Sequence, residues 1–321
     1  PKDARLHELI TDPQAQFNFY QRVTVEKLGR LPDEQLLERL NSHSQVICIV
    51  NTRKHAANLF SGLTGEGCFH LSTLMCATHR SQVIAEIRRR LKAGLPCRVI
   101  STQLLEAGVD LDFPVGYRAL AGIESINQAA GRVNREGKQA AASLYLFEPD
   151  SEDERRLPSY IKQTADVARV ILSHYENPIC MDAVREYYDL LYDTTDPAAF
   201  DSQHILSCFE KGDSPPTFDF HTAAERFKLI ADETKPVIIP FDDTSRRLVE
   251  ELATTIVPLA VLRKLQPYTV NIYQPEYEAL EASGAIDLYA DAYAVLNARG
   301  AYNENTGLVV PEKRGGYGII M

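Results

Sequence analysis

Two segments of the sequence carry residues of the kind that bind phosphate groups. The first begins at Thr102 and ends at Asp110 with the pattern T-x5-G-x-D, and the second begins at Gln128 and ends at Arg135 with the pattern Q-x-x-G-R-x-x-R. Arginine donates several hydrogen bonds to phosphate oxygens in a fixed fork, so two arginines close together suit a triphosphate. An isolated R-x-x-R more often marks an exposed helix edge. Two such patterns, each at a strand-to-helix junction, favour a nucleotide site instead.

The two arginines are expected to share one face of a helix. Residues 125–134 have a helical pattern, and Arg132 and Arg135 are three positions apart, which makes them neighbours on a helix surface. Gln128 lies one turn earlier on the same face, and Gly131 would let another backbone approach closely.

The elements that position these segments alternate between strand and helix from residue 31 to residue 147. Short apolar runs predict strands, and these are residues 46–50, 69–71, 98–101, 115–120 and 144–147. Helices are predicted from Pro32, through Ala56 to Phe60, and from a cap at Thr78 to just before Gly94. This alternation predicts a parallel sheet, in which ligands bind at the carboxyl ends of the strands. Polar Asn51, Ser101 and Thr102 fall at such ends.

The second half of the chain has a different character. Residues 148–154 are acidic and resemble an exit linker, and helices are predicted over residues 159–174 and 181–192. Residues 193–220 are rich in Pro, Asp, Ser and Thr and are predicted to be loop. From residue 223 the pattern is mixed α+β, with strands predicted at 237–239, 269–273 and 308–310.

The charge of the chain is divided unevenly. The net charge is −10, yet residues 30–138 hold 14 Lys or Arg against 10 Asp or Glu. A mildly basic half beside an acidic one suits a polyanion bound in a groove. The most basic cluster is Arg80, Arg88, Arg89, Arg90 and Lys92, although such a run is more often a solvated face. Without any Trp, base stacking would fall to Tyr117 or to tyrosines from Tyr268 onwards.

Composition excludes several classes of protein. No apolar run approaches the roughly 18 residues needed to cross a bilayer, so no membrane partner is expected. The six cysteines include no C-x-x-C pair, which favours reduced thiols in a cytosolic protein over a zinc site or a disulfide framework. The length of 321 residues suggests about two domains, and a first residue of Pro favours excision from a longer chain.

The two phosphate-binding patterns resemble motifs V and VI of superfamily 2 helicases, which belong to the second RecA-like domain of those enzymes. In that family ATP binds between two such domains. The resemblance implies that Arg135 is the arginine finger that reaches the γ-phosphate, assisted by Arg132, with Gln128 orienting and Asp110 contacting the ribose or coupling to DNA. Fingers of this kind contribute on the order of 10³–10⁵ in rate. Asn51 to Arg53 stand where motif IV belongs. The remaining implied contacts are Gly108 and Gly131 with ATP, and Asn51, Thr52, Arg53, Arg80, Ser101 and Thr102 with nucleic acid.

A narrower resemblance is to the CRISPR-associated helicase–nuclease of type I systems, most closely its type I-C branch. It rests on residues 101–103, 106–113, Arg118, 128–137, 46–58, 70–73, 79–80, 268–271 and 307–308. That family is recruited to a guide-RNA complex, pulls the displaced single-stranded DNA with ATP and cuts it with a metal-dependent nuclease domain. The implied parts are a lead-in from a first RecA-like domain (1–30), the second RecA-like domain (31–150), a helical linker (151–222) and a C-terminal α+β domain (223–321).

Half of such a motor is missing from the sequence. No G-x-x-x-x-G-K-[ST] loop occurs, so the groups that cradle phosphates and hold Mg²⁺ would come from the absent first RecA-like domain. Residues 229–234 imitate an Asp-Glu strand but follow the second pattern, which indicates coincidence. None of the eight histidines is followed by Asp, so no metal site is expected here. The chain alone is therefore not expected to hydrolyse ATP.

Three other interpretations remain open at this stage. The chain could belong to another superfamily 2 translocase without a nuclease, which the residues after Glu148 would distinguish. It could also be a stand-alone binding module, a half-motor that docks a partner or a phage-encoded inhibitor. A nucleotide-sugar or dinucleotide enzyme is the weakest of the three, because no G-x-G-x-x-G follows the first strand.

Overall fold

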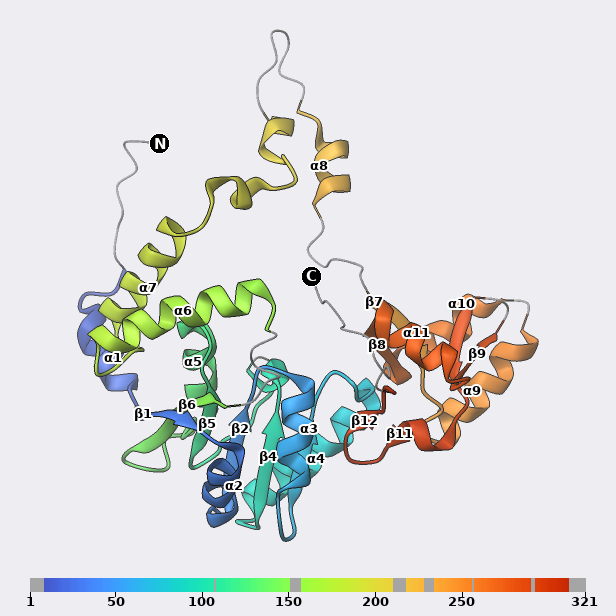
Figure 1. The fold of residues 1–321 in the computed structure, drawn as a ribbon, viewed down its shortest axis with the longest axis horizontal. Helices are drawn as coiled ribbons and strands as arrows, with labels where there is room; N and C mark the ends of the chain where they lie inside the picture. Colours follow the sequence, from blue (N-terminus) through green and yellow to red (C-terminus); the bar gives the residue numbers. More distant parts are fainter. Residues whose placement is uncertain are drawn as a thin grey trace.

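The computed structural model describes residues 9–106, 108–150, 157–209, 218–227, 234–255, 257–289 and 292–311. Figure 1 shows a layered body, a helical arm that rises from it, and a second unit beside the body formed by the described residues from 234 onwards.

The body is built on a six-stranded sheet in the order β1-β6-β5-β2-β4-β3, and every neighbouring pair is parallel. Its strands are β1 (Val23–Leu31), β2 (Gln45–Ile49), β3 (Cys68–Leu71), β4 (Cys97–Ser101), β5 (Gly116–Ala119) and β6 (Ala142–Pro149). The parallel α/β sheet predicted from the sequence is thus confirmed, with five of its strands close to their predicted positions.

Strand β1 was not predicted from the sequence. It lies at the edge of the sheet and pairs with β6 from Val23 opposite Ala142 to Leu31 opposite Pro149. Only Val23, Val25 and Leu31 are buried along it, and charged residues fill half of the remaining positions. An edge strand with so little apolar sequence gives a weak signal. A short helix, α1 (Pro13–Tyr20), precedes it.

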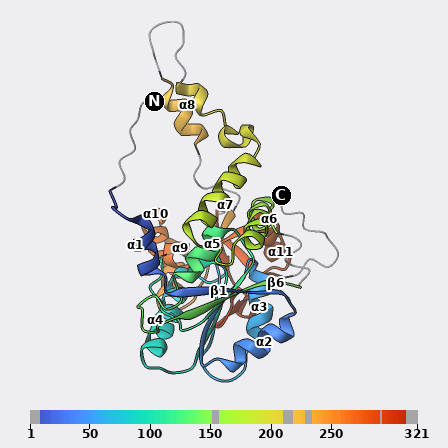
Figure 2. The ribbon, with the colours of Figure 1, turned by 90° about the vertical axis from the view of Figure 1, so that its left-hand side faces the viewer.

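Helices cover both faces of the sheet, as the edge-on view in Figure 2 shows. On one face α2 (Asp33–Ser42) and α3 (Arg53–Ser61) pack through Leu36, Leu40 and Leu59. On the other face lie α4 (Ala77–Lys92) and α5 (Ile123–Ala130). The strands are buried on both sides, which explains why they read as continuous apolar runs.

Two helix boundaries differ from the sequence prediction. Helix α5 ends at Ala130 instead of Asn134, because Gly131 forms its C-cap and Asn134 has a positive φ of 47°. Helix α4 begins at Ala77 after Cys76, so Thr78 is not the cap; its hydroxyl donates instead to the carbonyl oxygen of Pro267 at 3.4 Å.

The arm begins with the two helices predicted after the sheet. These are α6 (Ser159–His174) and α7 (Met181–Asp193), and their buried residues join the core on the α5 side of the sheet. Beyond them the predicted loop contains short 3₁₀ turns at Pro197–Asp201 and Leu206–Phe209, and then α8 (Phe220–Arg226).

The C-terminal unit contains a four-stranded sheet in the order β8-β7-β10-β9 and a two-stranded sheet of β11 and β12. Its strands are β7 (Thr234–Ile238), β8 (Thr269–Tyr273), β9 (Ile286–Tyr289), β10 (Tyr293–Leu296), β11 (Tyr302–Asn303) and β12 (Gly307–Leu308); its helices are α9 (Asp243–Thr254), α10 (Pro258–Leu265) and α11 (Gln274–Ala282). The mixed α+β character is confirmed, although β7 and β12 begin earlier than predicted. Apart from Thr234, the Asp-Glu imitation at 229–234 lies outside the described residues.

A hydrogen-bonded seam joins the C-terminal unit to the body. We use this name for Leu74, Cys76 and His79 of the body together with Phe241, Tyr302 and Leu308 of the unit. The hydroxyl of Tyr302 accepts from the main-chain N–H of Cys76 at 3.1 Å and lies 2.9 Å from Nδ1 of His79. The His79 ring stacks on Phe241, and the N–H of Leu308 donates to the carbonyl oxygen of Leu74 at 2.8 Å. Cys76 is also buried in the core of the C-terminal unit, so the two parts share packing.

No helix among the described residues is both long and apolar enough to span a membrane.

Candidate nucleotide and nucleic-acid site

Arg135 lies on an exposed turn that follows α5. Val133 forms a β-bridge with Phe113, and Asn134 then reverses the chain with its positive φ. The Arg135 side chain is 44% exposed, and its Nε lies 2.8 Å from Oδ1 of Asp110. The turn therefore brings together the ends of the two patterns, a guanidinium and a carboxylate, at a surface that solvent reaches.

Contacts of Arg22, Asn134 and Asp112 hold this turn in place. The guanidinium of Arg22, just before β1, donates to the carbonyl oxygen of Arg135 at 3.0 Å. The side-chain amide of Asn134 donates back to the carbonyl oxygen of Arg22 at 3.2 Å. The carboxylate of Asp112 accepts from the main-chain N–H of Arg135 at 2.7 Å. The contacts of Arg22 join segments more than 100 positions apart, so no local sequence pattern indicates them.

Arg132 has an environment unlike that of Arg135. It is buried, and it donates to the carbonyl oxygens of Leu105 and Glu106 at 2.9 and 2.8 Å. Burial lowers the pKa of Arg132, and the charge of Arg135 lowers it further. The expectation that both arginines project from one helical face is wrong, because the helix ends before either of them.

The other residues predicted to bind ATP surround the turn. Gln128 is exposed on α5, and Gly131 is exposed at the C-cap of that helix. Gly108 has a φ of 75°, which L side chains rarely adopt, so it lets the loop turn just before Asp110. A freely exposed guanidinium beside accessible main chain fits the phosphate end of a nucleotide.

The residues predicted to contact nucleic acid at the sheet gather at its carboxyl edge. The N–H of Val50 donates to the carbonyl oxygen of Ser101, and the N–H of Thr102 donates to that of Leu71. The Ser101 hydroxyl is fully buried and donates within this edge, and the Thr52 hydroxyl accepts from the N–H of His55 as the N-cap of α3. Thr102 is 6% exposed, and within the described part of the chain no hydrogen bond of its hydroxyl is seen, so this hydroxyl is the group that could meet a ligand.

Arg53 and Arg80 face other protein groups instead of open solvent. One Nη of Arg53 lies 2.6 Å from Oε1 of Glu276 on α11, and its guanidinium lies over the ring of Tyr273. Arg80 donates to the carbonyl oxygen of Met75 at 2.6 Å. Both arginines are therefore engaged near the junction with the C-terminal unit.

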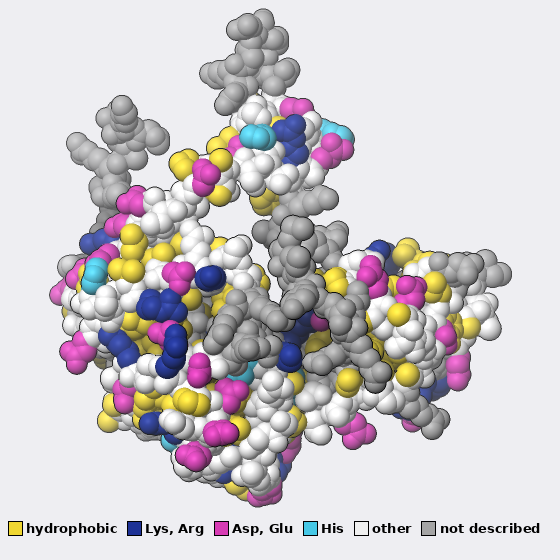
Figure 3. Space-filling view, in the orientation of Figure 1, with side chains coloured by type: hydrophobic (Ala, Val, Ile, Leu, Met, Phe, Trp, Pro, Cys, Tyr) yellow, Lys and Arg dark blue, Asp and Glu magenta, His cyan; other side chains and the backbone are white. Residues whose placement is uncertain are grey.

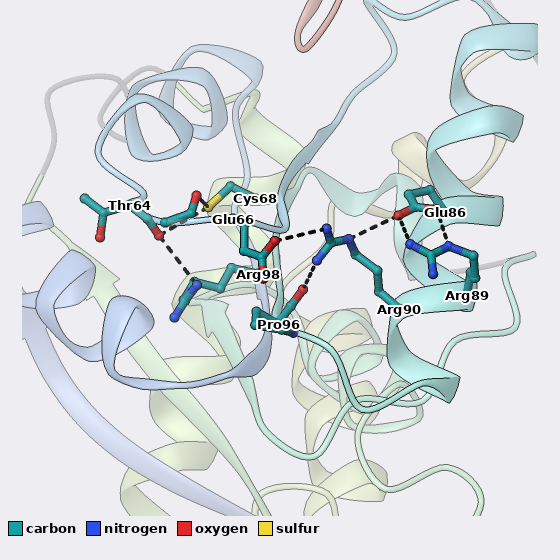
Figure 4. Close-up of polar contacts among 9 residues, drawn as sticks. Thr64, Glu66, Cys68, Glu86, Arg89, Arg90, Pro96 and Arg98 are labelled. Carbon is teal, nitrogen blue, oxygen red and sulfur yellow. Dashed lines mark hydrogen bonds and ion pairs between the residues drawn. The ribbon is translucent and has the colours of Figure 1, made fainter.

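Two arginines of the basic cluster on α4, Arg89 and Arg90, pair with acidic neighbours, as Figure 4 shows. Arg89 and Arg90 both pair with Glu86, at 2.6 and 3.1 Å, and Arg90 also lies 3.7 Å from Glu66. Arg90 donates to the carbonyl oxygen of Pro96, just before β4, which places this end of the helix at the amino edge of the sheet. The interpretation as a solvated face is therefore favoured over a nucleic-acid contact.

The tyrosines considered for base stacking differ in their exposure to solvent. Tyr117 is only 2% exposed and packs against Tyr145, so it is unavailable to a base. Tyr273 is 41% exposed and lies under Arg53.

A surface of mixed charge lies between α6 and the edge of the sheet. Dark-blue side chains gather over α6 in Figure 3, interspersed with acidic ones. A hollow of about 270 Å³ there is lined by Arg30, Lys162 and Arg169 together with Glu148 and Asp166. Arg169 pairs with both Asp166 and Glu148, so much of this charge is already balanced.

Beneath the site lies a buried polar network that the sequence analysis did not anticipate. Arg118 of β5 is fully buried, and its Nε lies 2.9 Å from Oε1 of Glu106, which is 6% exposed. Burial raises the pKa of Glu106, and the charge of Arg118 opposes that rise. Ser125 on α5 donates to the other carboxylate oxygen of Glu106 at 3.1 Å. The only sequence signal was a charged residue inside an apolar strand.

Within the described part of the chain no cluster of His, Cys, Asp or Glu could hold a metal ion.

The region that holds this site matches a known family. Residues 42–138 match the family described as CRISPR-associated nuclease/helicase Cas3, C-terminal. The chain is also 30% identical over 175 residues to the CRISPR-associated nuclease/helicase Cas3 of Methanothermobacter thermautotrophicus, covering 54% of this chain and 20% of that protein.

Solved structures share the fold. T. fusca Cas3 with ADP matches with a TM-score of 0.60 and 14% identity, over 96% of this chain and 44% of that one. A chain of a CRISPR RNA-guided surveillance complex, pre-nicking, matches with a TM-score of 0.54 and 16% identity, over 89% of this chain and 44% of that one. The chain spans about a fifth of the curated relative and under half of these solved chains. The RecA-like class of the parallel sheet agrees with these neighbours.

Proposed function

We propose that this chain is the second RecA-like half, with its accessory C-terminal unit, of an ATP-driven motor that moves along single-stranded DNA in CRISPR interference. Arg135 supplies the arginine finger. The observation that carries the proposal is the turn that holds Arg135 next to Asp110 on an exposed surface, within the segment that matches the Cas3 family.

The residues around this turn fit the phosphate end of ATP. Among the described residues, the guanidinium of Arg135 forms an ion pair with Asp110 alone, which is itself 76% exposed, so this pair is weak and easily exchanged for a phosphate. Bound ATP supplies the phosphoryl group, and Arg135 stabilises the charge that develops on it. Mg²⁺ would be held outside the described residues, since these contain no metal-binding cluster.

The carboxyl edge of the sheet supplies the track for single-stranded DNA. The Thr102 hydroxyl suits a phosphate contact, which holds a strand without reading its sequence. We extend the proposal to the division of the chain into residues 31–150, 151–222 and 223–321, and to a guide-RNA complex as the partner that presents the DNA. That partner is supported by the neighbour solved within a surveillance complex. The first RecA-like and nuclease domains would complete the enzyme.

The test is Arg135→Ala in the natural full-length polypeptide that carries this chain. We expect ATP turnover to fall by on the order of 10³-fold or more, because the finger acts only on the transferring phosphoryl group. The dissociation constant for oligo(dT) should change by less than about twofold, since the carboxyl edge is untouched.

Arg246→Ala is the matched control. Arg246 also forms an exposed ion pair with an aspartate, Asp243 at 2.6 Å, but in the C-terminal unit. It should leave both turnover and DNA binding unchanged. Retention of full turnover by Arg135→Ala would rule out the arginine-finger assignment.

A further inference from the structure

The loop from Thr102 to Asp110 has its two ends at two different candidate sites. Thr102 lies at the carboxyl edge, where its N–H donates to the carbonyl oxygen of Leu71. Asp110 lies beside Arg135. The loop is the covalent path between the DNA track and the nucleotide-facing turn, so what fixes its middle decides how the two sites influence each other. The inference that follows rests on the proposed function.

The middle of the loop is fixed at Glu106 through its carboxylate and its main chain. One carboxylate oxygen forms an ion pair with Nε of Arg118 at 2.9 Å, and the other accepts from the Ser125 hydroxyl at 3.1 Å. The carbonyl oxygen accepts from Arg132 at 2.8 Å, and the N–H donates to the carbonyl oxygen of Gln103 at 2.9 Å. Through Arg132 the loop is tied to the same turn that carries Arg135.

Arg118 also reaches the other site. Its Nη1 donates to Oδ1 of Asn51 at 2.7 Å and to the carbonyl oxygen of Ala119 at 2.8 Å. The Asn51 amide in turn donates to the carbonyl oxygen of Leu120 at 2.9 Å. One guanidinium therefore joins Asn51, at the end of β2, to Glu106 in the loop.

The energetics of this arrangement favour a positional role. Burying an ion pair such as Arg118–Glu106 costs several kcal/mol per ion in lost hydration. Apolar residues of similar volume in place of such a pair are often at least as stabilising. Buried charges that do remain must stay paired, since an unpaired one is costly. A displacement of Asn51 therefore obliges Arg118 and Glu106 to move with it.

We propose that Arg118 is a positioning residue that couples the DNA track to the nucleotide-facing turn. Nucleic acid that binds at Asn51 and Thr102 changes the position of the Arg118 guanidinium. That movement displaces Glu106, and through Arg132 it reaches the turn that holds Asp110 and Arg135.

The experiment uses this 321-residue chain, oligo(dT) as the ligand and hydrogen exchange as the readout. In the wild type, bound oligo(dT) should slow amide exchange in peptides that span residues 103–112 by on the order of fivefold, the lower end of typical coupling between sites. Arg118→Lys keeps the charge opposite Glu106 but lacks the fork needed to bond Asn51 as well. It should bind oligo(dT) within twofold of the wild type and lose the slowing.

Arg98→Lys is the matched control, because Arg98 lies on β4 of the same sheet and donates to the carbonyl oxygens of Asn41 and Thr64, away from the loop. It should behave as the wild type. If Arg118→Lys does not fold, Ser125→Ala, which removes one hydrogen bond to Glu106, should reduce the slowing in part.

The outcomes separate the two proposals. If oligo(dT) does not bind the wild type, the proposed function fails and the coupling with it. If oligo(dT) binds but exchange over residues 103–112 does not respond, or responds equally in Arg118→Lys, only the coupling role of Arg118 is overturned.

Discussion

His70 lies in β3 with its imidazole 2% exposed, and both ring nitrogens lack a hydrogen-bond partner among the described residues. The ring of Phe60 lies beside it, with 5.8 Å between the ring centroids. Burial lowers the pKa of His70 to about 4, with a smaller contribution from His79. The folded state therefore holds His70 neutral at a pH where an unfolded chain would protonate it.

This histidine should make stability depend on pH. Between the unfolded pKa of 6.5 and the folded pKa of about 4, the unfolded state binds the proton that the folded state excludes. The free energy of unfolding is therefore undiminished above 6.5 and falls as the pH is lowered through this window. At pH 5 the loss from His70 should be about 2 kcal/mol relative to pH 7.

His70→Leu should remove that part of the loss, which urea unfolding at pH 7 and pH 5 would measure. His79, whose pKa burial also lowers, stays in the variant and accounts for a residual drop. An equal fall in stability in wild type and variant would contradict the prediction.

At the scale of elements, tight turns decide where side chains point. The sequence of residues 125–134 reads as one helix, yet Gly131 ends it and Val133 pairs with Phe113. That pairing joins positions 20 apart, so the pattern of residues 125–134 alone could not reveal it. The chain also needs a glycine at the start of β12, where Gly307 has a φ of 84° and a Cβ would collide with the carbonyl oxygen of Leu74.

Gly307→Ala should therefore destabilise the contact between the C-terminal unit and the body. The backbone strain alone costs about 1–3 kcal/mol, and the collision with main chain adds to it. Thermal unfolding would measure the change. Gly300→Ala is the control, because Gly300 has open space around its Cα and no positive φ. Equal midpoints for the two variants would show that this position does not need glycine.

The strands and motifs were predictable because their signal is local, whereas the seam and the buried network were not. Apolar runs such as residues 46–50 and 98–101 predict buried strands, and the residues that follow them, Asn51 and Thr102, are therefore expected at the carboxyl edge of the sheet. The pairing of Arg118 with Glu106, or of Arg22 with the Arg135 turn, depends on how distant segments meet. From the sequence alone, Arg22 and Arg118 can be identified as charged residues, but their partners cannot be predicted.

At the scale of the whole molecule, the seam makes the body and the C-terminal unit one packed structure. Tyr302 is central to it, since its hydroxyl meets both Cys76 and His79. Burial raises the pKa of Tyr302, so the hydroxyl stays protonated and can both donate and accept.

Tyr302→Phe should weaken the seam by about 2 kcal/mol, because it leaves the Cys76 N–H and the His79 ring without this partner. In calorimetry the wild type should unfold both parts in one transition, and the variant should unfold the C-terminal unit at a lower temperature. Tyr277→Phe removes a hydroxyl of the same unit that makes none of the seam's hydrogen bonds and should leave the single transition intact. A single transition in both variants would show that the seam does not depend on the Tyr302 hydroxyl.

The shared packing at Cys76 also limits how such chains can be recombined. Exchanging the C-terminal unit with that of a relative would set a foreign surface against Leu74, Cys76 and His79, which here are covered by Phe241, Tyr302 and Leu308. Residues 74–79, which include the first turn of α4, should therefore be exchanged together with the C-terminal unit that begins at β7. A chimaera in which only the C-terminal unit is replaced would therefore divide the hydrophobic core that contains Cys76.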